Sequence, residues 1–219
     1  MALMPHHPLT LGITGHRPNR LAFNRLSALA GDVGDLLDRL RDFAPPGNSL
    51  TLVSSLAEGA DRIAASAALA RLVALVCPLP FPIDEYCRDF ADAASVAEFH
   101  SLLARAREVV ILPGRRDGTA TAYALAGGWM LDHVGLLIAI WDGGASAGAG
   151  GTRDLIGQAL ARGIPVIWLH ATEEFPPRLL RPQVGVSCNE GENLDNSTLR
   201  LLLASWTALT DDGGQDAAF

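Results

Sequence analysis

Short apolar runs alternate along the chain with longer segments in which apolar residues recur at helical spacing. Most of the runs are continuous rather than alternating with polar residues, which is typical of parallel strands covered on both faces. They predict strands near residues 9–14, 50–54, 73–77, 108–112, 136–141 and 165–169. Helical periodicity between them predicts helices near 20–43, 57–71, 94–106, 119–133 and 152–162.

This alternation predicts an α/β fold: a Rossmann-like, doubly wound, mainly parallel sheet of about six or seven strands, with helices on both faces. Residues 1–175 are expected to form this domain. Residues 176–219 are expected to be a C-terminal extension that packs on the same domain and carries one amphipathic helix, near 198–209. The proline-rich segment 78–92 predicts a loop with a short helix.

The net charge of −7 over 219 residues argues against a general nucleic-acid binder, which normally shows a basic face. No apolar run approaches the roughly 20 residues that cross a bilayer, so no membrane association is expected. With three cysteines, any disulfide scheme leaves one thiol unpaired, and the first nine residues lack a secretory signal. These features favour a cytoplasmic location with reduced thiols.

The chain contains no lysine, and all seventeen basic residues are arginine. This excludes a P-loop lysine, a Schiff-base lysine and a lysine general base. A phosphate would therefore be held by arginine, backbone N–H groups and hydroxyls. The histidines show no metal-ligand spacing with cysteines or carboxylates, so neither a metal nor another cofactor is expected.

A glycine-rich turn, G-A-G-G-T-R-D, follows the strand predicted at 136–141 and opens the next helix. Glycines let a ligand approach the backbone closely, and a helix start offers free N–H groups and the positive end of its dipole to an anion. The alternative is an ordinary tight turn with Thr152 as N-cap and Asp154 complementing the dipole. The candidate ligand-binding residues here are Asp142, Gly148, Gly150, Gly151 and Thr152.

The first strand ends in Thr14-Gly15-His16-Arg17-Pro18. Gly15 permits a tight turn, and Arg17 near a helix start is unfavourable unless an anion joins it. The alternative for Arg17 is a surface arginine paired with a carboxylate. His16 would donate to a ligand oxygen or move a proton, whereas the alternative is a structural histidine with its hydrogen bonds satisfied.

Polar residues also follow the second and fourth strands. Ser55 and Glu58 have the S-x-x-E spacing of a capping box, and the alternative is that Ser54, Ser55 and Glu58 bind ribose or phosphate groups. Arg115 and Arg116 would clamp a second phosphate, unless they belong to a solvated loop. Because ligands of open α/β sheets lie at the carboxyl ends of the strands, these loops are expected to share one crevice.

Four motifs in order resemble the SLOG superfamily, the group that includes the DNA-processing protein DprA and the Lonely Guy phosphoribohydrolases. They are GITGHRP at 12–18, SSLAEGADRIAA at 54–65, the AGG of the helix over 119–134, and IWDGGASAGAGGTRDLI at 140–156. The resemblance spans most of residues 9–170. It implies a Rossmann-like sheet that binds nucleotides or nucleotide-derived ligands at its strand ends. The implied crevice residues are Gly15, His16, Arg17, Ser54, Ser55, Glu58, Gly150, Gly151 and Thr152.

The catalytic motif of the Lonely Guy enzymes is only partly present. Those enzymes carry P-G-G-x-G-T-x-E-E, in which a glutamate assists N-glycosidic cleavage, together with an arginine-lysine pair on the preceding helix. Here Asp154 occupies the position of the first glutamate and Leu155 that of the second, and the segment 120–128 has no such pair. The chain is more similar to bacterial SLOG proteins, some relatives of which sense nucleotides in stress or defence settings.

Three functions follow, in order of preference. The first is binding of a nucleotide or an AMP- or ADP-ribose-like ligand without turnover, because the strand-end groups suit phosphate and ribose. The second is hydrolysis of the N-glycosidic bond of a nucleoside phosphate, with Glu58 and Asp154 as candidate catalytic residues. The third is a protein-interaction scaffold with a vestigial crevice. The expected partner is a small molecule, and assembly of identical chains stays open.

Overall fold

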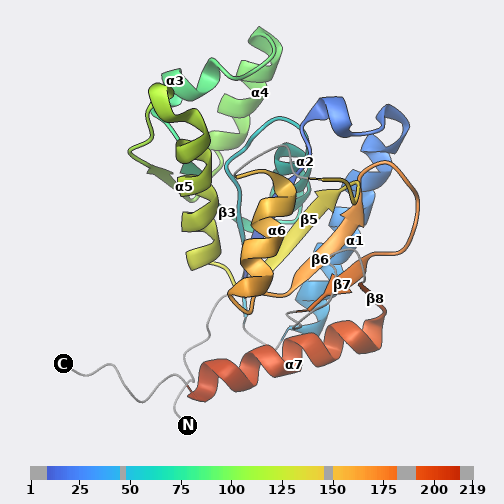
Figure 1. Ribbon diagram of the computed structural model, residues 1–219. Coiled ribbons are helices and arrows are strands. Elements are labelled where there is room, and N and C mark those ends of the chain that lie inside the picture. Colours follow the sequence, from blue (N-terminus) through green and yellow to red (C-terminus); the bar gives the residue numbers. More distant parts are fainter. Residues whose placement is uncertain (1–8, 45–47, 146–149, 182–190, 213–219) are drawn as a thin grey trace, which may run out of the picture.

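The computed structural model describes residues 9–44, 48–145, 150–181 and 191–212. Its centre is an eight-stranded sheet in the order β4-β3-β2-β1-β5-β6-β7-β8 (Figure 1). The strands are β1 (Leu9–Gly15), β2 (Leu50–Val53), β3 (Ala74–Leu79), β4 (Glu108–Ile111), β5 (Leu136–Trp141), β6 (Val166–His170), β7 (Arg178–Leu180) and β8 (Glu192–Asn193). Strands β1 to β6 pair in parallel, and β7 and β8 add to the edge in antiparallel.

The chain reverses its direction of travel across the sheet between β1 and β5. It moves outward from β1 through β2 and β3 to β4, then returns to place β5 on the other side of β1, with Gly15 opposite Ile140. Ligands of doubly wound folds bind at such a switch point, outside the carboxyl ends of the strands.

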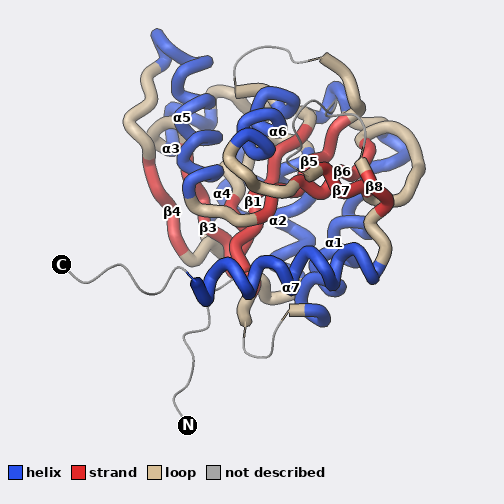
Figure 2. The backbone as a smooth tube through the Cα atoms, turned by 60° about the horizontal axis from the view of Figure 1, so that its bottom comes forward, coloured by secondary structure: helices blue, strands red, loops and turns tan. Residues whose placement is uncertain are grey.

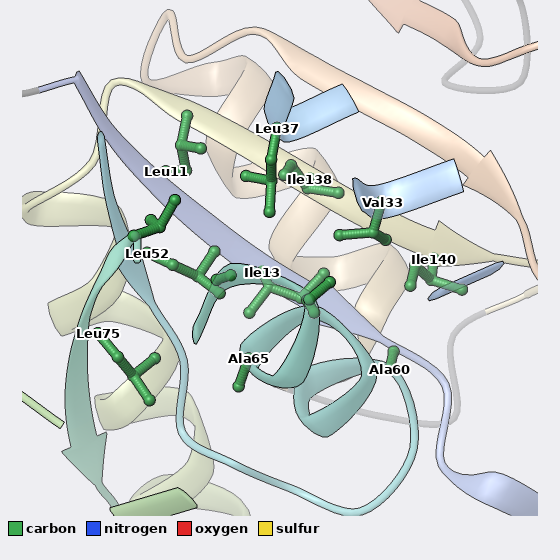
Figure 3. Close-up of a cluster of buried hydrophobic side chains, with 14 of the residues drawn as sticks. Leu11, Ile13, Val33, Leu37, Leu52, Ala60, Ala65, Leu75, Ile138 and Ile140 are labelled. Carbon is green, nitrogen blue, oxygen red and sulfur yellow. The ribbon is translucent and has the colours of Figure 1, made fainter. Parts of the chain in front are cut away.

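Helices cover both faces of the sheet because each central strand is apolar on both sides. In β5, Ile138 and Ile140 join the apolar cluster formed with α1 and α2, while Leu137 and Trp141 join the cluster formed with α5 and α6. Figure 3 shows the first cluster, where side chains of β1, β2 and β5 meet those of α1 and α2. The helices are α1 (Leu26–Phe43), α2 (Ala60–Ala70), α3 (Ile83–Cys87), α4 (Ala93–Leu103), α5 (Thr119–Asp132), α6 (Thr152–Ala161) and α7 (Asn196–Asp212).

The last helix, α7, lies against α1 (Figure 2). Its Leu199 is buried in the same cluster as α1, and Arg39 of α1 donates to the Asn196 side chain over 3.0 Å. None of the described helices combines the length and the apolar run that a bilayer crossing requires.

The predicted fold class is confirmed, with two more strands than the six that the apolar runs indicated. Strands β7 and β8 escaped prediction because they are only three and two residues long, too short for a period-two pattern. The helix predicted from residue 20 begins at Leu26, since Pro18–Arg20 and Phe23–Arg25 form separate 3-10 turns. The helix predicted from residue 57 begins at Ala60, because Leu56 and Gly59 have positive φ angles of 56° and 94°.

Candidate functional site

A cavity of about 450 Å³ lies at the carboxyl ends of β1 and β5, at the switch point. This volume is within the range of small-molecule sites, roughly 300–1,000 Å³. Of the predicted residues, the structure brings seven to its walls: Gly15, His16, Arg17, Ser55, Gly150, Gly151 and Thr152. Six others (Ser54, Glu58, Arg115, Arg116, Asp142 and Asp154) do not line it, and Gly148 lies outside the described residues.

Gly15 is the point where β1, β5 and α2 come closest together. A Cβ atom on Gly15 would lie 2.3 Å from the Cβ of Ala60 and 2.8 Å from the carbonyl oxygen of Ile140. The Ala60 N–H donates to the His16 carbonyl over 3.1 Å, which fixes the start of α2 against the end of β1. The motif glycine therefore lets two strand ends and a helix start form one wall of the cavity.

The turn before α6 forms part of the cavity wall. Gly150, with φ of 77°, donates its N–H to the Asp154 carboxylate over 2.7 Å, and Gln158 donates to the same oxygen over 3.1 Å. No protein group among the described residues accepts from the amides of Gly151 and Thr152, which line the cavity at the helix start. These amides and the helix dipole are the elements of an anion site.

Two details of this turn differ from the sequence-based expectation. The N-cap position belongs to Gly151, so Thr152 is the first helical residue rather than the cap. Asp154 holds the turn together from inside, and its carboxylate does not reach the cavity wall.

Removing the Asp154 carboxylate is expected to loosen this turn. The Asp154→Ala variant loses the acceptor for the Gly150 N–H, and loss of such a capping contact costs about 1 kcal/mol of unfolding free energy. Urea denaturation measures the difference. Asp154→Asn, which keeps an acceptor oxygen, is the control and should lose less; an equal loss in both variants would contradict this role.

Arg17 brings a weakly compensated positive charge to the cavity. Its side chain is 36% exposed, its Nη2 lies 3.4 Å from the Tyr123 hydroxyl, and its Nη1 is 4.0 Å from the Glu58 carboxylate. Burial alone would lower the pKa of Arg17, but Tyr86, Tyr123 and Asp61 raise it and prevail. The guanidinium is therefore charged at any physiological pH, and its ion pair with Glu58 among the described residues is long, at 4.0 Å.

His16 and Asp142 form a pair beside the cavity. The His16 Nε2 lies 2.8 Å from the Asp142 carboxylate and 3.2 Å from the Asp142 backbone nitrogen. A single ring nitrogen cannot donate a hydrogen to the carboxylate and also accept one from the backbone N–H. The shorter contact joins a donor to an anion, so we place the hydrogen on Nε2. Burial would raise the pKa of Asp142, but hydrogen bonds from His16, the Gly144 amide and Arg20 lower it to about 2.

The predicted capping box is wrong. Glu58 turns away from the start of α2 and accepts from the Ala91 N–H over 2.8 Å and from the Ser95 hydroxyl. Burial would raise the pKa of Glu58, but these hydrogen bonds lower it. Ser54 accepts from the Leu56 N–H over 3.1 Å, which supports the positive φ of Leu56. Because this backbone bends before Ala60, Ser55 and Glu58 cannot occupy the N-cap and N3 positions.

The predicted phosphate clamp at Arg115 and Arg116 is not at the cavity. Arg116 is bound by Glu85, at 3.1 Å, and by Asp89, and its guanidinium lies 4.6 Å from the ring centroid of Phe81. Arg115 is exposed and pairs with Asp117. The carboxylates that neutralise Arg116 come from α3 and the residues after it, a contact that no sequence spacing indicates.

Sequence reasoning missed two buried polar residues that line the cavity, Asp61 and Tyr86. Asp61 lies within a quoted motif, but a carboxylate in the first turn of a helix is expected for the dipole alone. It is only 8% exposed, and burial raises its pKa to about 6 despite the opposing effect of Arg17. No three histidine, cysteine or carboxylate side chains gather as a metal site in the part of the chain that is described.

No family model matches the chain, and no curated protein sequence matches it. Among solved structures, the DNA processing protein A of Streptococcus pneumoniae matches 89% of this chain with a TM-score of 0.54 and 16% identity. The chain spans 61% of that protein's length. The chain therefore shares the Rossmann-like α/β fold of that protein. The expectation from the four motifs is thus confirmed at the level of the fold.

Two further matches have lower TM-scores. DNA processing protein A of Helicobacter pylori, described by its single-stranded DNA binding mode, matches 94% of this chain and 81% of its own, with a TM-score of 0.48 and 14% identity. The molybdenum cofactor (Moco) carrier protein of Chlamydomonas reinhardtii matches 76% of this chain and 78% of its own, with a TM-score of 0.44 and 16% identity.

The exclusion of nucleic acid as a partner is therefore overturned. The chain shares its fold with the DNA processing protein A of Streptococcus pneumoniae. Net charge describes the whole chain, whereas binding depends on the local field. Here Arg17, Arg20 and Arg153 lie around one cavity of an acidic protein.

Proposed function

We propose that this chain binds a nucleotide or a nucleotide-derived ligand, AMP-like or ADP-ribose-like, in the cavity at the ends of β1 and β5. The observation that carries the proposal is the pair of amides at Gly151 and Thr152, which have no acceptor among the described residues, in the same cavity as the weakly paired Arg17. Together they supply the backbone donors and the guanidinium that a chain without lysine must use for phosphate.

Charge and size support this ligand class. Among the described residues of the cavity wall, the side chains that can carry charge are three arginines, the Asp61 carboxylate and His16. The helix dipole of α6 adds partial positive charge at Gly151. Tyr123, Met130 and Leu155 supply apolar surface in the same cavity, as expected of sites that bind a ligand with both charged and apolar parts.

Hydrolysis of an N-glycosidic bond is the second candidate function, and its candidate catalytic residue is Asp61 in place of Glu58 and Asp154. Glu58 and Asp154 are engaged by Ser95 and Gly150 outside the cavity. Asp61 is inside it, and a carboxyl group with a pKa of about 6 suits proton transfer near neutral pH. Under this alternative, chromatography would find free base after incubation with a nucleoside phosphate, and Asp61→Asn would release none.

The binding proposal is tested by thermal unfolding of the full chain with AMP, ADP-ribose, NAD, cyclic nucleotides, inorganic phosphate and a single-stranded DNA oligonucleotide. A ligand at 100 times its Kd adds about 2.7 kcal/mol of stability. We expect at least one mononucleotide-type ligand to raise the midpoint. No shift with any of them would overturn the proposal, and a shift with the oligonucleotide alone would replace the small ligand by nucleic acid.

Arg17→Gln is expected to weaken binding of the best ligand about tenfold to a hundredfold, because hydrogen bonds to charged groups contribute about 1.5–3 kcal/mol. Calorimetric titration measures this loss. Arg115→Gln is the matched control, since Arg115 is exposed and outside the cavity. Equal affinity of the wild type and Arg17→Gln would show that the guanidinium does not contact the ligand.

A further inference from the structure

Two buried polar side chains line the cavity but are not among the groups that we propose bind the phosphate. Asp61 is 8% exposed, and Tyr86 is fully buried with a hydroxyl that has no hydrogen-bond partner among the described residues. A buried polar atom left without a partner costs about 1–3 kcal/mol. Nearly all such atoms in proteins are satisfied by protein, water or ligand. The Asp61 carboxylate already accepts hydrogen bonds from Ser54 and from the Ala57 backbone. The Tyr86 hydroxyl has no such partner, and its position in the cavity wall indicates that a ligand group completes it.

A bend in the backbone determines where α2 begins, and Asp61 lies in the first turn of this helix. The bend before α2 is fixed by the Ser54 hydroxyl, which accepts from the Leu56 N–H, and by Arg62, whose Nε donates to the Leu56 carbonyl over 3.1 Å. Leu56 keeps a φ of 56° inside this bend. Such strained backbone persists only where its surroundings determine it, and it gathers at ligand sites.

Asp61 is also adjacent to the strand ends that form the anion site. Its neighbour Ala60 is the residue that Gly15 approaches most closely, and Gly15 in turn lies against Ile140 at the end of β5. In a nucleotide, the sugar is joined directly to the phosphate and the base lies beyond it. The polar group next to a bound phosphate therefore meets the sugar.

We propose that Asp61 and Tyr86 bind the vicinal diol of a ribose, an assignment that rests on the proposed nucleotide site. The two sugar hydroxyls would donate to the Asp61 carboxylate, and one would accept from the Tyr86 hydroxyl. A vicinal diol matches an acceptor-only carboxylate beside a phenol that can donate. The negative charge of Asp61 repels phosphate from this end of the cavity, so the pair also sets the direction in which a nucleotide enters.

The test compares AMP with 2′-deoxyadenosine 5′-monophosphate by calorimetric titration. The wild type is expected to bind AMP tenfold to a hundredfold more tightly, because the deoxy compound loses a hydrogen bond to a charged group. Asp61→Asn should abolish most of this preference, and Tyr86→Phe should reduce it about threefold to tenfold. Asp132→Asn is the control, since that carboxylate is exposed and pairs with Arg162 away from the cavity.

The outcomes separate the two proposals. Equal binding of both nucleotides by the wild type would overturn the diol assignment and leave the phosphate site standing. A preference for AMP that survives in both variants would overturn the assignment to Asp61 and Tyr86. Binding of neither nucleotide would overturn the diol assignment, whereas the proposed nucleotide site is overturned only if every other ligand of the thermal panel fails as well. The wild-type comparison needs no variant, so it holds even where a substitution impairs folding.

Discussion

At pH 8, the Asp61→Asn protein is expected to be more stable than the wild type. Burial raises the pKa of Asp61 from 3.8 to about 6, so keeping this carboxyl ionised in the folded state costs free energy. Each pKa unit corresponds to 1.36 kcal/mol, which gives an upper limit of about 3 kcal/mol for this group. For a chain of this length, that limit corresponds to a rise in Tm of roughly 6–12 °C.

The difference in unfolding free energy between Asp61→Asn and the wild type is expected to become smaller as the pH falls. Between pH 4 and 6 the folded protein binds the Asp61 proton more tightly than the unfolded chain does, so this group's contribution to stability falls as the pH rises. Asp61→Asn lacks that slope, and its advantage should vanish below pH 4. Urea denaturation of both proteins across this range measures it; a variant that is less stable at pH 8 would contradict the account of a buried charge.

A natural residue that destabilises the free protein requires an explanation from function. Asp61 lies in the cavity wall, where a ligand hydroxyl or a nearby cation can offset the cost of its charge. Perturbed carboxyl groups in clefts are more frequent at functional sites than elsewhere. A gain in stability combined with a loss of the preference for AMP in Asp61→Asn would therefore join structure to function.

The Gly59→Ala variant is expected to be severely destabilised, by about 3 kcal/mol or more. Gly59 has φ of 94° and ψ of −124°, a conformation that is essentially restricted to glycine. A Cβ atom there would lie 2.5 Å from the His16 carbonyl oxygen and 3.1 Å from the Arg17 backbone. Both are rigid backbone contacts, so relief would require α2 to separate from the end of β1.

Gly31→Ala is the matched control for this prediction. Gly31 lies on the exposed side of α1, and a Cβ atom there would meet nothing within 4 Å. Helix propensity alone predicts a gain of about 0.5–1 kcal/mol. Thermal and urea unfolding of both variants give the comparison. A loss below 1 kcal/mol in Gly59→Ala would show that the junction of β1 and α2 is not the rigid element described here.

The sequence predicts the sheet well because the evidence for its strands is local. The run Leu136–Trp141 is apolar at every position, as a central parallel strand requires, and the structure reproduces its bounds. The glycines of the strand-end motifs also have local signatures, and Gly15, Gly150 and Gly151 line the cavity as expected.

The rest of the site depends on contacts between distant segments, which residue spacing does not encode. Arg116 is neutralised by Glu85 and Asp89, 31 and 27 residues earlier, and Glu58 is held by Ser95, 37 residues later. The capping-box spacing of Ser55 and Glu58 was a false signal because Leu56 and Gly59 bend the backbone between strand and helix. Tyr86 reaches the cavity only through the tertiary position of α3.

In the proposed site, the amides at the start of α6 receive the phosphate of a nucleotide. Titration of the isotope-labelled chain with AMP, followed by backbone amide NMR, observes those groups directly. We expect the largest changes in amide shift at Gly151 and Thr152, with the Kd found by calorimetry, and the same changes at about tenfold to a hundredfold higher AMP concentration in Arg17→Gln. Saturable binding that leaves both amides unchanged while others shift would contradict the claim.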